Sequence, residues 1–180
     1  QQLENIGLLK MDFLGLKNLS ILEKAIFNIK KNQGVEIDLE TIPLEDKKTF
    51  EMLSEGETTG VFQFESAGMR RYLRELKPTE LEDLVAMNAL YRPGPMEYIP
   101  QYIEGKHDHE TVKYMHPVLE PILRKTYGIA VYQEQVLRIA QDFAGFSLGE
   151  ADILRKAIGK KIAEILAEQR SKFIEGAVAK

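Results

Sequence analysis

Cysteine is absent from the 180-residue chain. This excludes a disulfide framework and a thiolate metal site, and it fits a reducing compartment. No apolar run approaches the roughly 18 residues of a membrane-spanning helix, and the opening QQLENIG lacks the basic start and apolar middle of a signal peptide. We therefore expect a soluble, cytoplasmic protein with no membrane partner. The chain begins without Met and ends on EGAVAK, so we also expect it to be part of a longer protein.

Two common catalytic motifs are also missing. No GxSxG sequence occurs, and Ser66 has no histidine close to it in sequence, so a hydrolase is disfavoured. The glycines and the GK pair of GEADILRKAIGKK have the wrong spacing for a Walker phosphate loop. His107, Asp108 and His109 could indicate a metal site, but a polar stretch of this kind is more typical of a solvated turn.

The net charge of the chain is small, but the charged residues are unevenly distributed along it. A formal net charge of −4 argues by itself against a nucleic-acid binder. Residues 36–57, however, hold eight acids and two lysines, whereas residues 151–180 hold seven bases and four acids. Four of these bases form a dense basic cluster: Arg155, Lys156, Lys160 and Lys161.

A hydrophobic content of 44% is enough for a substantial core, and the patterning predicts a mainly helical α+β fold with a small β element. The alternation of side chains between two faces in GLLKMDFLGL predicts a strand over residues 7–16. A helix with Gly34 as its C-terminal cap is predicted to follow. The composition of TTGVFQF predicts a brief strand over residues 58–64. Further helices are predicted over residues 44–53, 66–76, 79–90, 95–105, 117–125, 133–144, 147–158 and 162–177.

Two of these helices carry a start signal. Thr79 with Glu82, and Ser147 with Glu150, have the spacing of a capping box, in which the two side chains bond each other's backbone amides. We expect the helix that begins at Ser147 to end at Gly159.

Asp12 is the one acid in the apolar stretch 7–16. Burying a carboxylate costs several kcal/mol unless a cation, a metal ion or hydrogen-bond donors compensate it. Lys10 would lie on the same face of the predicted strand and could pair with Asp12. The residues alone leave two interpretations open: a structural salt bridge, or a carboxylate that holds a divalent ion.

The basic cluster also has two interpretations. Cations at the C-terminal end of a helix offset the negative end of its dipole. The same residues could instead hold a triphosphate or a nucleic-acid phosphate, for which Arg offers a planar donor fork and Lys a point charge. Phosphoryl transfer by two metal ions needs both carboxylates and remote cations, so Asp12 and the basic cluster have suitable chemistry for its two halves.

Six stretches of the chain strongly resemble the alpha subunits of bacterial DNA polymerase III, the C-family replicative polymerases. They span residues 8–161 in the family's order, and they read KMDFLGLKNL, ETTGVFQFESAGM, ALYRPGPM, TYGIAVYQEQV, AQDFAGFSLGEAD and LRKAIGKK. The resemblance implies that residues 1–34 form the end of a polymerase-beta-like palm and that residues 35–180 form mainly helical fingers.

The resemblance also implies roles for individual residues. The third catalytic aspartate of the family lies in DFLGL, which maps onto Asp12 and implies a ligand for catalytic Mg²⁺; the other two belong to an upstream Asp-x-Asp motif that this chain does not include. Lys10 could then reach a phosphate. The pair of bases in LRKAIGKK implies that Arg155 and Lys156 contact the triphosphate, although many relatives are expected to have Arg at the second position, and a Lys lacks its planar fork.

Other candidates are less determined. We include Lys160 and Lys161 as nucleotide-binding residues, and also Arg92, which could equally satisfy the carbonyls of the turn YRPGP. For the polar residues of VYQEQV, a structural hydrogen-bonding role is favoured: Gln133, Glu134 and Gln135.

The implied function is DNA-directed DNA synthesis, a nucleotidyl transfer in which the primer 3′ hydroxyl attacks the alpha phosphate of a deoxynucleotide, two Mg²⁺ ions stabilise the charge and pyrophosphate leaves. The implied partners are primer-template DNA and deoxynucleoside triphosphates, with the sliding clamp, proofreading and clamp-loader subunits bound through other regions. We expect the isolated chain to be inactive, because one carboxylate cannot position two metal ions. The alternative is a non-catalytic helical module that binds nucleic acid or a protein through the basic cluster.

Overall fold

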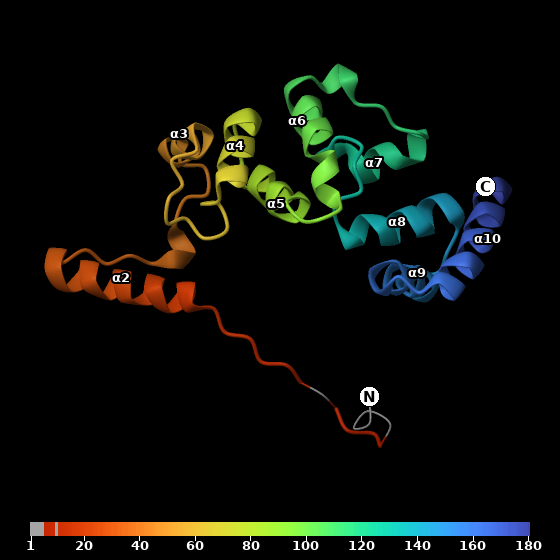
Figure 1. The fold of residues 1–180 in the computed structure, drawn as a ribbon, viewed down its shortest axis with the longest axis horizontal. Helices are drawn as coiled ribbons and strands as arrows, with labels where there is room; N and C mark the ends of the chain where they lie inside the picture. Colours follow the sequence, from red (N-terminus) through yellow and green to blue (C-terminus); the bar gives the residue numbers. More distant parts are fainter. Residues whose placement is uncertain (1–5, 10) are drawn as a thin grey trace. The chain divides into compact units, whose positions relative to one another are not determined.

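The computed structural model describes residues 6–9 and 11–180. Regular structure in these residues is helical, and no strand occurs among them. The chain divides into two compact units between Pro43 and Leu44 (Figure 1), and each unit is described by itself. The predicted mainly helical character is confirmed, whereas the predicted boundary at residues 34 and 35 stays a prediction.

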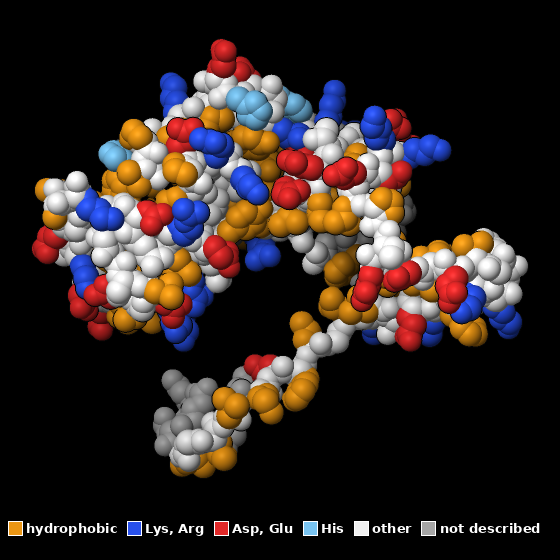
Figure 2. All heavy atoms as spheres, turned by 180° about the vertical axis from the view of Figure 1, so that it is seen from behind, with side chains coloured by type: hydrophobic (Ala, Val, Ile, Leu, Met, Phe, Trp, Pro, Cys, Tyr) orange, Lys and Arg blue, Asp and Glu red, His pale blue; other side chains and the backbone are white. Residues whose placement is uncertain are grey.

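The first unit contains α2 (Lys17–Gln33) and the short 3-10 helix η1 (Leu39–Thr41). Gly34 ends α2 as predicted: its φ of 70° is left-handed, and its amide donates to the Lys30 carbonyl. Residues 11–16, the described end of the predicted strand, form neither helix nor strand. Hydrophobic side chains stand out along this stretch (Figure 2), and Phe13 is 92% exposed. A strand needs a partner strand for its backbone groups, and no strand occurs among the described residues.

The second unit, Leu44–Lys180, begins with helices that share one hydrophobic core. They are α3 (Lys47–Glu55), α4 (Ala67–Leu76), α5 (Leu81–Leu90), the 3-10 helix η2 (Pro95–Tyr98) and α6 (Ile99–His107). Leu73, Leu76, Met87 and Ile99 are fully buried in this core. These helices match the predicted series closely, because each has apolar residues at helical spacing.

The predicted strand over residues 58–64 is wrong, since these residues form consecutive turns. The Val61 amide donates to the Thr58 carbonyl at 3.0 Å, and the Phe64 amide donates to the Val61 carbonyl at 3.0 Å. Gln63 has a left-handed φ of 65°, which interrupts an extended conformation. The buried Thr58 hydroxyl donates to the Phe64 carbonyl at 2.6 Å and ties the two ends of the turns together.

Short helices lead to a three-helix C-terminal part. The short elements are η3 (His109–Thr111), η4 (Pro117–Leu119), α7 (Glu120–Leu123) and η5 (Arg124–Thr126). The long ones are α8 (Gln133–Ala144), α9 (Leu148–Lys160) and α10 (Ala163–Ala179), which pack on one another. A second core lies between them, built on Ala140, Ala144, Phe146 and Ala151. The three alanines among them let the helices approach closely.

One of the two predicted capping boxes is confirmed. The Ser147 hydroxyl accepts from the Glu150 amide at 3.4 Å, and Glu150 Oε2 accepts from the Ser147 amide at 2.8 Å. The box predicted for Thr79 and Glu82 is wrong, because α5 begins at Leu81 and the acid that receives the free amides is Asp83. The chain enters this helix later than the sequence suggested, which moves the capping position by one residue.

No helix in the described part of the chain is both long enough and apolar enough to cross a membrane.

Candidate nucleotide-binding site

Three residues of the basic cluster lie on α9 beside α8, and Lys161 follows as the C-cap of α9. Arg155, Lys156 and Lys160 line a pocket of about 330 Å³ together with Gln133, Val136 and Ile158. Its apolar residues come from both helices, whereas its charged residues are all basic. An anion in this pocket would therefore meet the cations of α9 beside apolar surface from both helices.

Arg155 is held in place from two helices. Its Nε and Nη2 donate to Oδ1 of Asp152 at 2.9 and 2.7 Å, and its Nη1 donates to Oε1 of Gln133 on α8 at 3.0 Å. The Arg155 side chain is 28% exposed. It is thus fixed at the pocket wall and still reaches solvent.

Lys156 shares the same acid. Its Nζ lies 2.7 Å from Oδ2 of Asp152, so the two oxygens of one carboxylate hold two neighbouring cations. Hydrogen bonds from Lys156 and then Arg155 hold the pKa of Asp152 below its usual value. Asp152 therefore stays ionised at neutral pH and keeps both bases close to it.

The end of α9 differs from the prediction. The helix runs through Gly159 to Lys160, and Lys161 provides the left-handed cap with a φ of 53°. The amide of Ile162 closes the turn by donating to the Ala157 carbonyl at 3.1 Å. A dipole effect is confined to the last turn of a helix, where Lys160 is the base of α9. Arg155 lies further back, so its position is explained by Asp152 and Gln133 and not by the helix end.

The remaining predicted site residues lie elsewhere. Asp12 belongs to the first unit, in the stretch before α2, and its side chain is exposed. Lys10 lies outside the described residues, so its pairing with Asp12 stays a prediction. Arg92 is exposed in the turn before η2, and within the described residues its side chain makes no hydrogen bond or ion pair. The interpretation that it satisfies carbonyls of this turn is therefore not supported.

The polar residues of VYQEQV separate into different roles. Gln135 is buried; its Oε1 accepts from the amides of Val131 and Tyr132, and its Nε2 donates to the Ile122 carbonyl and to Thr126 Oγ1. This is the structural role that the sequence favoured. Gln133 contacts Arg155 instead, and Glu134 is exposed.

His107 and His109 each contact another part of the chain. His107 Nε2 lies 2.9 Å from the Glu75 carbonyl, and the His109 ring lies against Tyr127 at 5.6 Å. Among the described residues, no group of three or more His, Cys, Asp or Glu side chains is arranged to hold a metal ion. Residues 107–109 are exposed as predicted, but His107 is the last residue of α6 and His109 the first of η3, so the stretch is not a simple turn.

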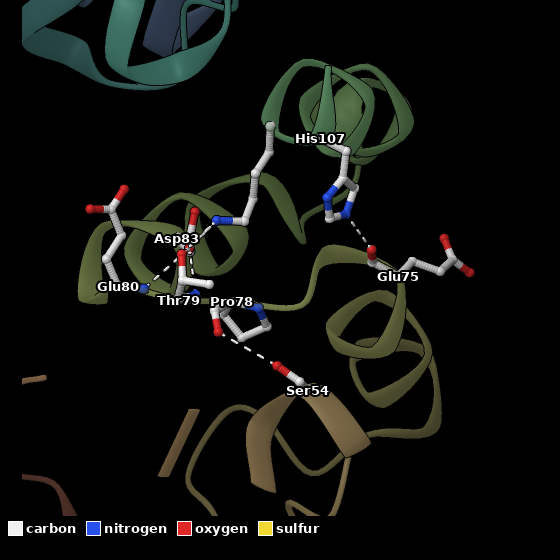
Figure 3. A network of polar contacts seen from close by, with 8 residues as sticks. Ser54, Glu75, Pro78, Thr79, Glu80, Asp83 and His107 are labelled. Atoms are coloured by element: carbon white, nitrogen blue, oxygen red, sulfur yellow. Dashed lines mark hydrogen bonds and ion pairs between the residues drawn. The ribbon is translucent and has the colours of Figure 1, made fainter. Parts of the chain in front are cut away.

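Sequence reasoning missed a buried ion pair in the first core. Lys106 Nζ of α6 lies 2.7 Å from Oδ2 of Asp83 on α5, and the Asp83 side chain is only 1% exposed. The same oxygen accepts from the amides of Thr79 and Glu80 at the start of α5, as Figure 3 shows. Its other oxygen, Oδ1, is buried and has no hydrogen-bond partner among the residues that the structure describes. A larger hollow of about 620 Å³ lies nearby, but its lining mixes Glu45, Glu51 and Glu80 with Lys47 and Lys77, unlike the basic pocket.

Comparisons with known proteins all indicate the same protein family. Residues 18–180 match the model of the bacterial DNA polymerase III alpha subunit finger domain. Similar proteins include the DNA polymerase III subunit alpha of Staphylococcus aureus, 58% identical over 97% of this chain, and that of Halalkalibacterium halodurans, 56% identical over 99% of this chain. The chain spans only 16% of the length of each relative.

Proposed function

Because this chain belongs to the family of bacterial DNA polymerase III alpha subunits, we propose that it forms part of a DNA-directed DNA polymerase. In that reaction the 3′ hydroxyl of a primer attacks the alpha phosphate of an incoming deoxynucleoside triphosphate, and pyrophosphate leaves. Residues 35–180 act as the fingers that bind the nucleotide, and residues 1–34 as the end of the palm.

The basic pocket is the observation that carries this proposal. Phosphoryl transfer depends on positioning and on stabilising the charge of the phosphates. Arg155 offers a planar donor group that is already fixed at the pocket wall by Asp152 and Gln133. Lys156 and Lys160 add positive charge on the same wall. We assign Arg155 the main contact to the triphosphate and the lysines supporting roles.

Asp12 is proposed as the catalytic carboxylate. A carboxylate oxygen is the kind of ligand that Mg²⁺ takes, and the exposed side chain of Asp12 is accessible to an ion. Two such ions, when bound, stabilise the negative charge of the attacking and leaving oxygens. Asp12 alone does not make a site for two ions, so the remaining ligands belong to the parent protein, and the isolated chain is proposed to be inactive.

The other candidates and partners are part of the same proposal. Lys10, Lys161 and Arg92 contribute positive charge to the path of the triphosphate or the template. Primer-template DNA is the macromolecular substrate, and the sliding clamp, proofreading and clamp-loader subunits bind other regions of the parent protein. We place the polymerase in the cytoplasm.

Steady-state kinetics of the complete polymerase with Arg155→Ala test the proposal. A charge-assisted contact to a triphosphate contributes more than about 1.4 kcal/mol, so the KM for deoxynucleotides should rise at least about tenfold. The melting temperature should change little. Arg138→Ala is the matched control, because Arg138 on α8 also pairs with an acid one turn away, Asp142 at 3.4 Å, but does not line the basic pocket. Unchanged nucleotide kinetics with a lowered melting temperature would mean that Arg155 serves the fold and not the substrate.

A further inference from the structure

Asp152 holds the two central bases of the pocket as a pair. It lies three residues before Arg155 and four before Lys156, so all three side chains share one face of α9. Oδ1 receives Arg155 and Oδ2 receives Lys156, in each case at 2.7 Å. One carboxylate therefore fixes the distance between a guanidinium and an ammonium.

Gln133 holds the opposite end of the guanidinium. Its Oε1 accepts from Nη1 of Arg155 at 3.0 Å, and it reaches across from α8. As a neutral group, Gln133 orients the guanidinium without cancelling its charge. The contacts to Asp152 and Gln133 do not use every N–H of Arg155, because a guanidinium carries donors on each nitrogen. Donors on Arg155 and Lys156 thus stay available to a second acceptor.

We propose that Asp152 is a positioning residue for the triphosphate site: it holds Arg155 and Lys156 in the arrangement in which they receive phosphate, and it remains in place when the nucleotide binds. The proposal rests on the proposed function, in which these two bases contact the triphosphate. Long basic side chains lose rotamer freedom when they are immobilised by a ligand, and ordering them beforehand improves affinity. Because Asp152 carries one negative charge and the two bases carry two positive charges, the group as a whole remains positively charged.

The opposite role would give the opposite result. If Asp152 occupied the place of the phosphate, the nucleotide would have to displace it, and removing the carboxylate would strengthen binding. If Asp152 positions the bases, removing it lets both side chains move, and binding weakens. The direction of the change in KM therefore distinguishes the two roles.

The test measures KM and kcat for deoxynucleotides in the complete polymerase with Asp152→Ala, Asp152→Glu and Arg155→Ala. For Asp152→Ala we expect KM to rise about fivefold, equivalent to about 1 kcal/mol, with a smaller change in kcat. Asp152→Glu should recover part of the loss, because a longer carboxylate on the same helix face can still reach both bases. Asp142→Ala is the matched control: this acid forms an ion pair with Arg138, outside the pocket, and its removal should leave KM unchanged.

The outcomes separate this inference from the function on which it rests. A lower KM in Asp152→Ala, or an unchanged KM with a lowered melting temperature, would overturn the positioning role while a raised KM in Arg155→Ala left the triphosphate contact standing. An unchanged KM in Arg155→Ala itself would overturn the triphosphate contact and the positioning role with it. A raised KM in both variants, with partial rescue by Asp152→Glu, supports both.

Discussion

Asp83 and Lys106 join α5 to α6 through an ion pair of 2.7 Å in which the acid is almost completely buried. Asp83 lies next to the amides that begin α5, so it serves as a helix cap and as a partner for Lys106 at once. Within the described part of the chain, its second oxygen has no hydrogen-bond partner. The pair thus compensates a buried charge, and each member depends on the other.

Removing only the cation should be costly. Lys106→Met leaves the Asp83 carboxylate buried without its counter-charge, and breaking such pairs costs about 3 to 5 kcal/mol. We expect that loss in the free energy of unfolding measured by urea denaturation of the chain. Arg138→Met, which breaks an exposed ion pair on one helix, should cost less than about 1 kcal/mol.

A double variant separates the charge from the packing. In Asp83→Asn with Lys106→Met, the buried group is neutral, and its amide oxygen can still accept from the Thr79 amide. The double variant should therefore be more stable than Lys106→Met alone. Equal stability of the two would contradict the idea that an uncompensated charge causes the loss.

Gln135 should matter far more to stability than its neighbour Glu134. Gln135→Ala leaves the Val131 and Tyr132 amides and the Ile122 carbonyl without the partner they have now, and unsatisfied buried groups cost about 1 to 3 kcal/mol each. We expect a loss of at least about 2 kcal/mol in urea unfolding. Glu134→Ala, at an exposed position of the same helix, should stay within about 0.5 kcal/mol of the unchanged chain.

The sequence-based fold prediction was most accurate where the structure is determined by residues close together in the sequence. The bounds predicted for α8, residues 133–144, agree with the structure, because apolar spacing and helix ends are determined by near neighbours. Residues 58–64 misled the prediction because their strand-like composition is overruled by turn geometry at Gln63. Gly159 misled it too, since α9 continues through the glycine and ends where Lys161 turns left-handed.

The bases that line the pocket were visible in the sequence as a cluster, whereas their contacts were not. The spacing of Asp152 from Arg155 and Lys156 is visible in the sequence, yet a solvated helix face has the same pattern. That Gln133 meets Arg155 depends on how α8 packs on α9 across 22 positions, and the pairing of Lys106 with Asp83 likewise joins separate helices. Contacts of this kind come from tertiary packing, on which local patterns carry no information.

The Glu150 carboxylate should give the chain a pH-dependent part of its stability. Hydrogen bonds from Lys172 on α10 and from Ser147 lower its pKa from the ordinary 4.5 to about 2. A carboxylate whose pKa is lowered by folding contributes stability above its unfolded pKa and loses it as the pH falls through the folded value. The contribution of Glu150 should therefore be complete above about pH 5 and disappear between pH 4.5 and about 2.

Thermal melts of the unchanged chain and of Glu150→Gln, recorded from pH 7 to pH 2, check this. The two melting temperatures should differ at neutral pH and converge in the acid range. Glu104→Gln is the control: Glu104 is exposed on α6, and its carboxylate makes no hydrogen bond or ion pair with the described residues. A difference that persists at pH 2 would mean that Glu150 acts through packing and not through its charge.

Lys161 allows its charge and its backbone role to be separated. A non-glycine residue in the left-handed conformation costs about 1 to 2 kcal/mol, so Lys161→Gly should raise the free energy of unfolding, whereas Lys161→Ala keeps the strain. Both variants lose the ammonium. If the charge helps to hold the triphosphate, both should raise the KM for deoxynucleotides in the complete polymerase by a similar factor, about threefold for 0.7 kcal/mol. A change in KM in only one variant would point to the backbone instead.

Asp12 provides the most direct test of the proposed chemistry. Asp12→Asn keeps the shape of the side chain and removes the charge that a divalent ion requires. In the complete polymerase, DNA synthesis should fall by about a hundredfold or more, since loss of a group that stabilises transition-state charge costs about 2.7 kcal/mol or more. Binding of primer-template DNA, measured separately, should persist. If Asp12 instead forms a structural salt bridge with Lys10, the variant should lose stability and keep its turnover per folded molecule, and Lys10→Met should reproduce the same loss.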